Sequence, residues 1–468
     1  MTLSSPKKRP LSEAKDKDTH DDDDVRKKVK STPSSTPSIN QYTGWKVPSN
    51  NYTIPTIHIG GGTDGTDDIE SQRETITPES FYNEYIRQRK PVVLRTDKSS
   101  SLLSDLSKLT EWKDINYLKS QVDSKHTVMV EQRSCSSPAK STFGNGYEIP
   151  MTFSQFASLV ASGKDDKHYL TTQDVHSSAD GRPDLMSPLM KYLQHDFPLQ
   201  PYIMGNLIPQ NINLWMGNSS DGVSSGLHHD YHDNLYIVLK GTKRFRLYSP
   251  HDTEWMYTRG QLAKVHPNGR INYHGEETTA YGADLKADMA ARAAKRKEDA
   301  ERMLEEAERA VEEGIEGADR MLEEAEVELE EAMDDIIDAE VDDDDDGNDN
   351  GKECVYETFG DERKRVVDKT VVDPNNFSKI KPHMLNDTAV LNESYPDFLN
   401  ATAAYCTVQE GDILYLPASW FHEVTSYGGQ KGHLAMNYWF HPPDGDSFEL
   451  PYSTDFWPND YKDRFEKG

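Results

Sequence analysis

The feature that most constrains the fold of this chain is a histidine and aspartate motif that leads into two apolar segments. The motif occupies residues 228–230, and the segments are residues 235–240 and 243–248, separated by Gly241 and Thr242. Their composition predicts two β-strands joined by a tight turn. Side chains alternate across a strand, so His228 and Asp230 are expected to point the same way and His229 the opposite way.

A His-x-acid pair is a weak signal alone, because 16 His among 81 acidic residues give about three such pairs by chance. Two further copies begin at His20, in a charged tail, and at His274, beside an acidic segment. Neither leads into an apolar run that could build a pocket. His228 and Asp230 therefore remain as two ligands of a 2-His-1-carboxylate iron site, which keeps open positions for oxygen and a co-substrate.

A second motif, near the C-terminus, offers the third ligand. Residues 411–424 open with a Gly-Asp turn, continue as an apolar strand, and break at Pro417. Trp420, His422 and Val424 then share one face. A lone histidine in such surroundings is more often a satisfied core residue than a ligand. The upstream motif favours ligation by His422 in this chain.

Lys243 is expected to face the apolar interior. On the second predicted strand it shares a face with Phe245 and Leu247, whereas Arg244 and Arg246 share the other. An inward lysine is costly unless it meets an anion, and a dicarboxylate co-substrate would supply one. The alternative is a lysine that reaches solvent from its place beside the turn.

With these motifs the chain resembles the jumonji-C (JmjC) branch of the Fe(II)- and 2-oxoglutarate-dependent oxygenases, which are double-stranded β-helix (cupin-type) proteins. The matching segments are residues 81–94, 213–217, 227–250, 411–424 and 436–440. Within that branch the chain is most similar to the small JmjC hydroxylases of the lysyl hydroxylase type. The implied fold is mainly β with flanking helices, a double-stranded β-helix (cupin/jelly-roll) core with a long acidic helical insertion.

The resemblance also implies site residues. The iron ligands fall on His228, Asp230 and His422, and the lysine that pairs with the distal carboxylate of 2-oxoglutarate falls on Lys243. Further cofactor-binding residues fall on Tyr169, Ser225, Asn234 and Asn437. For these four, ordinary hydrogen bonding at strand ends is the alternative. The implied reagents are Fe(II), 2-oxoglutarate as co-substrate, and O2.

The leading functional hypothesis is a dioxygenase that hydroxylates a side chain of a protein substrate, with lysine as the first candidate. The short gap between Asp230 and Lys243 favours a hydroxylase over the JmjC lysine demethylases. Cys135, Cys354 and Cys406 are too isolated to build the zinc modules common in those demethylases. A demethylase, a tRNA-base hydroxylase and an inactive cupin binding module remain alternatives. Nucleic acid is disfavoured as a partner because no basic face is concentrated in the sequence.

The acidity of the chain is concentrated in one segment. Residues 281–350 hold 28 Asp and Glu against 8 Lys and Arg, which is −20 of the total charge of −29. A motif at residues 302–308 reappears at 320–326, and small or apolar residues recur with heptad-like spacing. The segment is predicted to form a solvated helix or hairpin. The alternative is a coiled-coil contact with itself or with a basic partner.

Composition divides the rest of the chain. We expect a disordered tail with basic clusters (1–41), an α/β part packing on the barrel (42–165), the barrel itself (166–274 and 352–446), the insertion (275–351) and a C-terminal extension (447–468). No segment reads as a signal peptide or membrane span, which predicts an intracellular protein of the nucleus, the cytoplasm or both, without a membrane partner. Family relatives often dimerise through C-terminal elements, so a homodimer stays open.

Overall fold

The computed structural model describes residues 38–59, 76–96, 101–133, 147–179, 181–219, 222–340, 374–429 and 432–466. The elements below all belong to one compact unit, residues 39–468. Most of the tail for which disorder is predicted lies outside the described residues. So does position 352, where the barrel was expected to resume; the described chain resumes at residue 374.

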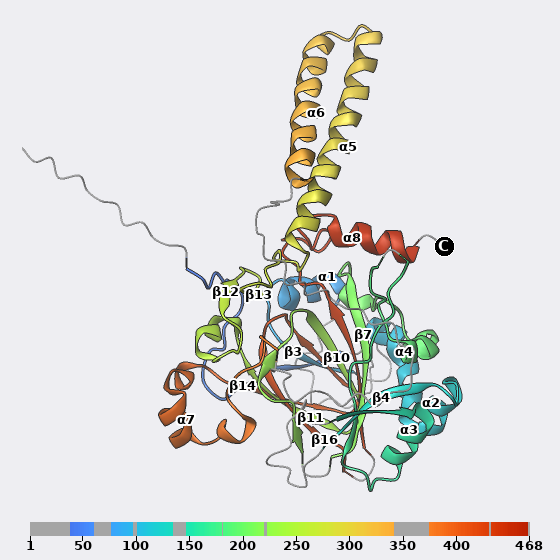
Figure 1. The fold of residues 1–468 in the computed structure, drawn as a ribbon, viewed down its shortest axis with the longest axis vertical. Helices are drawn as coiled ribbons and strands as arrows, with labels where there is room; N and C mark the ends of the chain where they lie inside the picture. The colour runs from blue at the N-terminus through green and yellow to red at the C-terminus, as the bar shows by residue number, and fades with distance from the viewer. Residues whose placement is uncertain are drawn as a thin grey trace, which may run out of the picture. The chain divides into compact units, whose positions relative to one another are not determined.

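The larger of two main sheets has nine strands in the order β2-β3-β15-β10-β17-β7-β6-β4-β5 (Figure 1). Its strands are β2 (Thr56–Ile59), β3 (Val92–Thr96), β4 (Thr127–Gln132), β5 (Tyr147–Thr152), β6 (His168–Leu170), β7 (Pro209–Gly217), β10 (Asp233–Lys240), β15 (Asp412–Leu416) and β17 (His433–Phe440). β10 lies between β15 and β17 and pairs antiparallel with both. The strand that follows the His-x-Asp motif is therefore an interior strand of this sheet.

The smaller main sheet carries the remaining strands of the barrel. It runs β1 (Tyr52–Thr53), β14 (Ala404–Gln409), β11 (Thr242–Tyr248), β16 (Phe421–Tyr427) and β8 (Val223–Ser224), and β9 (His228–His229) also pairs with β16. A separate two-stranded sheet pairs β12 (Leu262–Val265) with β13 (Ile271–Tyr273). Two main sheets with flanking helices are thus present, as the expected double-stranded β-helix core requires.

The two strands predicted around Gly241 both form, but they do not pair as a hairpin, because β10 belongs to the larger sheet and β11 to the smaller one. Gly241 makes this crossing with a φ of +83°, and a side chain there would bring its Cβ to 2.6 Å from the carbonyl oxygen of Tyr427. The turn therefore directs the chain from one sheet to the other.

The N-terminal part does more than pack on the barrel. β2 and β3 extend the larger sheet at one end, and β4 and β5 extend it at the other. The helices of this region are α1 (Pro78–Phe81), α2 (Ile115–Gln121) and α3 (Phe153–Ala161), with a 3-10 segment at Ser101–Lys113, and α4 (Pro188–Leu193) follows in the next part of the chain. The apolar residues of these helices join the largest buried cluster with the larger sheet.

The acidic insertion folds as a helical hairpin of α5 (Leu285–Glu312) and α6 (Ala318–Glu340) (Figure 1). The contact between the helices is made by small residues, since Ala293, Ala300, Ala307, Ala318, Ala325 and Ala332 are all buried. Arg296 of α5 binds Glu328, Glu331 and Asp335 of α6 at 2.6–2.8 Å. The small residues with heptad-like spacing therefore lie in the contact between α5 and α6. Among the described residues, no helix is both long and apolar enough to cross a bilayer.

The C-terminal region completes the fold. α7 (Thr388–Ser394) precedes β14, and α8 (Phe456–Tyr461) follows β17. Aromatic side chains anchor the expected C-terminal extension: Phe448 packs on the largest core, while Tyr452, Phe456 and Trp457 join a small cluster with Tyr281. Trp457 donates a hydrogen bond of 2.8 Å to the carbonyl oxygen of Tyr281. This contact holds α8 near the base of α5.

Candidate metal centre and its pocket

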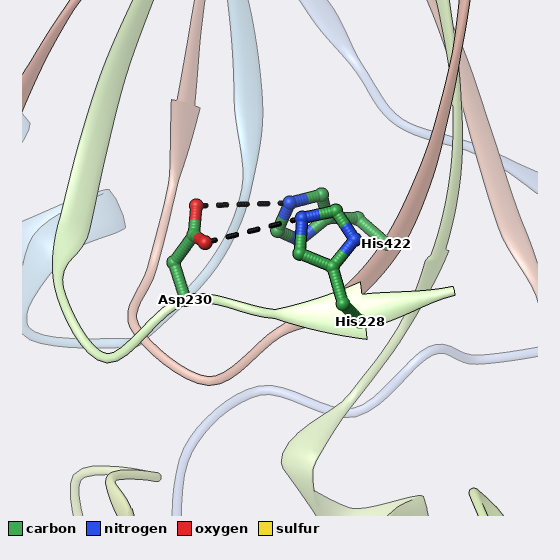
Figure 2. Close-up of side chains that lie close together, drawn as sticks. All are labelled: His228, Asp230 and His422. Carbon is green, nitrogen blue, oxygen red and sulfur yellow. Dashed lines mark ion pairs between the residues drawn. The ribbon is translucent and has the colours of Figure 1, made fainter. Parts of the chain in front are cut away.

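Strand pairing brings the two sequence motifs together. β9 pairs antiparallel with β16, and the register places His228 directly opposite His422. Asp230 follows β9, and its carbonyl oxygen accepts a hydrogen bond of 2.7 Å from the backbone N–H of Ser419, in the turn before β16. The three side chains converge on one point although His422 is 192 positions after Asp230 (Figure 2).

The geometry of the three side chains suits a shared ion. Nε2 of His228 lies 4.0 Å from one carboxylate oxygen of Asp230, and Nε2 of His422 lies 3.7 Å from the other. The histidine ring centroids are 4.3 Å apart, and one ligand atom from each residue lies within 4.8 Å of the others. These distances are too long for direct hydrogen bonds. Two imidazoles and one carboxylate are the donor set of a non-haem iron site.

Backbone carbonyls fix the orientation of both imidazoles. Nδ1 of His228 donates to the carbonyl oxygen of Gly226 at 3.0 Å, and Nδ1 of His422 donates to that of Trp420 at 2.9 Å. Each ring therefore presents the lone pair of its Nε2 toward Asp230. Burial, and next the nearby His422, lowers the pKa of His228 to about 4, so this imidazole is neutral at physiological pH and available as a ligand.

The segment that returns from the acidic insertion forms one wall of this centre. The ring of Phe377 stacks on His228 with centroids 4.8 Å apart and an interplanar angle of 10°. Asn376 is fixed beside it, because its carbonyl accepts from the N–H of His229 and its side chain donates to the His229 carbonyl. His229 points away from the ligands and binds the hydroxyl of Tyr273 at 2.8 Å, as the predicted alternation requires.

A cavity of about 210 Å³ lies between the two sheets, and all three candidate ligands line it. It is lined by Arg133, Tyr169, Thr172, Trp215, Val223, Ser224, Ser225, His228, Asp230, Asn234, Tyr236, Lys243, Phe245, Asn376, Phe377, His422, Val424, Ser426 and Trp439. The walls are mainly apolar and aromatic, with charged groups at a few positions. Such a cavity can enclose a small acid and exclude water around it.

Lys243 reaches this cavity, as its predicted inward orientation requires, and only 1% of its surface is exposed. Its Nζ donates to Oγ of Ser426 at 2.7 Å and lies 3.3 Å from Nδ1 of His433. Burial, and next the charge of Arg133, lowers the pKa of Lys243 to about 7. The structure thus holds the ammonium group in the interior, where an anionic ligand would raise its pKa again.

The four remaining candidate residues divide into two groups. Tyr169, Ser225 and Asn234 line the cavity. Ser225 also accepts a hydrogen bond from the N–H of Val424 and thereby ties the chain before the motif to β16. Asn437 lies behind the wall, where it bonds Asn234 and the indole of Trp215. Its contact with any ligand is therefore indirect, through the orientation of those two side chains.

Several residues of the cavity escaped the sequence reasoning. Ser426 contacts Lys243, Phe377 and Asn376 form the wall beside His228, and Arg133 adds a second cation; His433, outside the lining, contacts Lys243 from behind. Ser426 could have been found, since it lies four residues after His422 on the same face of one strand. No local signal marks the others, because they reach the cavity through long-range pairing.

A buried ion pair connects the chain segments that lie next to Asp230 and His422. Asp233, at the start of β10, accepts two hydrogen bonds from Arg89 at 2.5 and 2.9 Å, one from Tyr415 at 2.7 Å and one from the N–H of Ala418 at 2.9 Å. Arg89 adopts a φ of +56° and accepts a hydrogen bond from the indole of Trp420. One carboxylate therefore connects the chain after Asp230 with the turn that leads to His422.

Comparison with known proteins agrees with this geometry. A family model described as a cupin-like domain matches residues 78–446. "JmjC domain-containing protein 4" of Schizosaccharomyces pombe is 35% identical over 420 residues, covering 81% of this chain and 85% of that protein.

Two further relatives are more distant or shorter in overlap. "Lysine-specific demethylase JMJ32" of Arabidopsis thaliana is 24% identical over 234 residues, which is 50% of this chain and 42% of that protein. Human "Bifunctional peptidase and (3S)-lysyl hydroxylase JMJD7" is 36% identical over 83 residues, 18% of this chain and 24% of that protein. Because the family model spans more than half of the chain, this protein belongs to the cupin-like, JmjC-domain family.

Proposed function

We propose that this protein is an Fe(II)- and 2-oxoglutarate-dependent dioxygenase that hydroxylates a side chain of a protein substrate. Members of its family are typically oxygenases of this kind. The single observation that carries the proposal is the convergence of His228, Asp230 and His422 in the cavity that also contains Lys243. An inactive binding module has no physical need for all four.

The residues of the chain have separable roles in this reaction. His228, Asp230 and His422 would hold the metal, and the carboxylate compensates part of its charge. Lys243 would bind the distal carboxylate of 2-oxoglutarate, and Ser426 orients its ammonium group. Bound Fe(II) and 2-oxoglutarate together supply the oxidising power needed to insert an oxygen atom from O2 into a C–H bond.

The walls of the cavity would protect this chemistry from solvent. Trp215, Phe245 and Trp439 line the cavity from different strands, and Phe377 covers the ring of His228. Their apolar surfaces exclude water from the space around the ligands. The stacked Phe377 also limits rotation of the His228 ring, so the ligand is held in its orientation before a metal binds.

Lysine is the first candidate for the hydroxylated side chain. One relative is named as a lysyl hydroxylase and another as a lysine demethylase, so lysine is shared by the two names. The short gap between Asp230 and Lys243 favours hydroxylation. The two outcomes differ in mass, because hydroxylation retains one added oxygen atom and demethylation removes a methyl group.

The test uses purified protein with Fe(II), 2-oxoglutarate and proteins from cell extract. Succinate formation and a product heavier by one oxygen atom are expected with the wild-type protein and absent with His228→Ala and Asp230→Ala. His274→Ala is the matched control, since His274 begins another His-x-acid copy and its side chain is exposed. Equal turnover in the ligand variants and the control would reject the proposal.

A further inference from the structure

Two buried cations face one cavity without an anionic partner. Lys243 is 1% exposed and Arg133 is 9% exposed, and both line the cavity of the candidate metal centre. Within the described part of the chain, neither side chain forms an ion pair, and the hydrogen-bond partners of Lys243 are the neutral Ser426 and His433. Burial of an unpaired charge is costly, so such a pair indicates a site for an anion.

Both cations lie within about 6 Å of the centre of the Tyr169 ring. Nζ of Lys243 lies 5.8 Å from the ring centroid, and the guanidinium carbon of Arg133 lies 5.1 Å from it. The backbone explains why Arg133 lies near this ring. Arg133 follows β4, and its N–H donates to the carbonyl of Lys167. Tyr169, two residues after Lys167, pairs with Glu131 of β4. The pairing of β4 with β6 therefore delivers Arg133 to the lysine end of the cavity.

The guanidinium of Arg133 has hydrogen-bonding capacity that the protein leaves unused. Its Nε is buried and has no acceptor among the described residues. The contact with the Tyr169 ring satisfies the face of the guanidinium but none of its five N–H donors. Because both residues line the same cavity, a carboxylate bound in it could accept hydrogen bonds from both groups.

We propose that Arg133 is a second anchor for the distal carboxylate of the co-substrate, beside Lys243, and that the pair selects a 2-oxo diacid over a 2-oxo monoacid. This inference rests on the proposed function and deepens it. The carboxylate would meet two positive charges and up to three hydrogen-bond donor groups counting Tyr169. Arg133 is a binding residue here, whereas a purely structural arginine would only support the Tyr169 ring.

Equilibrium binding tests the proposal without turnover. The protein is loaded with Mn(II) in place of Fe(II), and the dissociation constant is measured calorimetrically for 2-oxoglutarate and for 2-oxopentanoate, which has the same chain length without the distal carboxylate. Loss of a charge-assisted hydrogen bond predicts a rise of about 10-fold or more in the dissociation constant of 2-oxoglutarate for Arg133→Gln. The constant for 2-oxopentanoate should stay unchanged, which also reports an intact fold.

Arg244→Gln is the matched control, because it removes the same charge from the residue next to Lys243 on the outward, exposed face of β11. Arg133→Lys should recover part of the affinity. If Arg133→Gln binds 2-oxoglutarate as tightly as Arg244→Gln, or weakens both acids equally, Arg133 is not an anchor although the proposed function stands. If the wild-type protein binds no 2-oxoglutarate, the proposed function itself fails.

Discussion

The buried pair of Arg89 and Asp233 predicts a large, partner-dependent loss of stability. The exposed fractions are 3% and 0%, and the Asp233 carboxylate accepts four hydrogen bonds. Asp233→Asn keeps an acceptor for Ala418 but leaves the guanidinium of Arg89 without a counter-charge in the interior. Breaking a buried pair in this way costs about 3–5 kcal/mol, a large part of the 5–15 kcal/mol that stabilises a typical domain.

Removal of both charges should cost less than the sum of the single changes. In Arg89→Met/Asp233→Asn no charge is left buried, so a coupling of about 2–3 kcal/mol is expected between the two positions. Urea unfolding followed by tryptophan fluorescence measures the four free energies of unfolding at one pH. Unfolding must be two-state for each variant.

The pair of Arg95 and Asp412 offers an internal comparison. Its hydrogen bonds have similar lengths, 2.6 and 2.8 Å, but the Arg95 side chain is 38% exposed. Arg95→Gln should cost less than Asp233→Asn, about 1–2 kcal/mol, because water reaches the Arg95 side of the pair and the Asp412 carboxylate, itself only 3% exposed, keeps a hydrogen bond from the N–H of Gln409. The reasoning is refuted if Asp233→Asn costs less than about 1 kcal/mol. It is also refuted if the losses of Arg89→Met and Asp233→Asn add up, within about 0.5 kcal/mol, to the loss of the double variant Arg89→Met/Asp233→Asn.

Three further predictions concern the cavity and the insertion. Burial lowers the pKa of Lys243 from 10.5 to about 7. Between these pH values Lys243 binds fewer protons in the folded chain than in the unfolded chain. The free energy of unfolding of the ligand-free protein should therefore rise with pH in this range. Lys243→Met should lose this slope in urea titrations, and an identical slope would contradict the burial argument. Phe377→Ala, which uncovers His228, should weaken Mn(II) binding about 10-fold by calorimetry, and unchanged affinity would show that the stacking does not hold the ligand. Replacement of residues 301–326 by a short glycine-containing turn should leave 2-oxoglutarate binding unchanged; a weakened affinity would show that the hairpin serves the cavity.

The residues of the candidate metal centre could be picked out because their signal is local. His228 and Asp230 are two positions apart beside a strand, and His422 follows a strand that Pro417 ends, so residue spacing alone fixed which side chains share a face. The inward orientation of Lys243 followed from the same alternation. That the two motifs meet was inferred from resemblance and not from any property of the 191 residues between Asp230 and His422.

The sheet assignment and the far wall of the cavity could not be predicted. Local sequence shows that residues 233–240 and 242–248 are strands, but whether consecutive strands pair or separate into two sheets depends on the partners that flank them. Arg133 and Phe377 carry no motif. Each reaches the cavity through backbone hydrogen bonds to a segment far along the chain, and such pairings leave no periodic trace in the sequence.

The position of β10 has a consequence for synthesis of the protein. Both of its neighbours in the larger sheet, β15 and β17, lie more than 170 residues later in the chain, beyond the whole helical hairpin. During translation this apolar strand must therefore wait with two open edges until residues 412–440 have left the ribosome. Unpaired apolar edges invite aggregation, so the nascent chain should depend on chaperones until its last strands arrive.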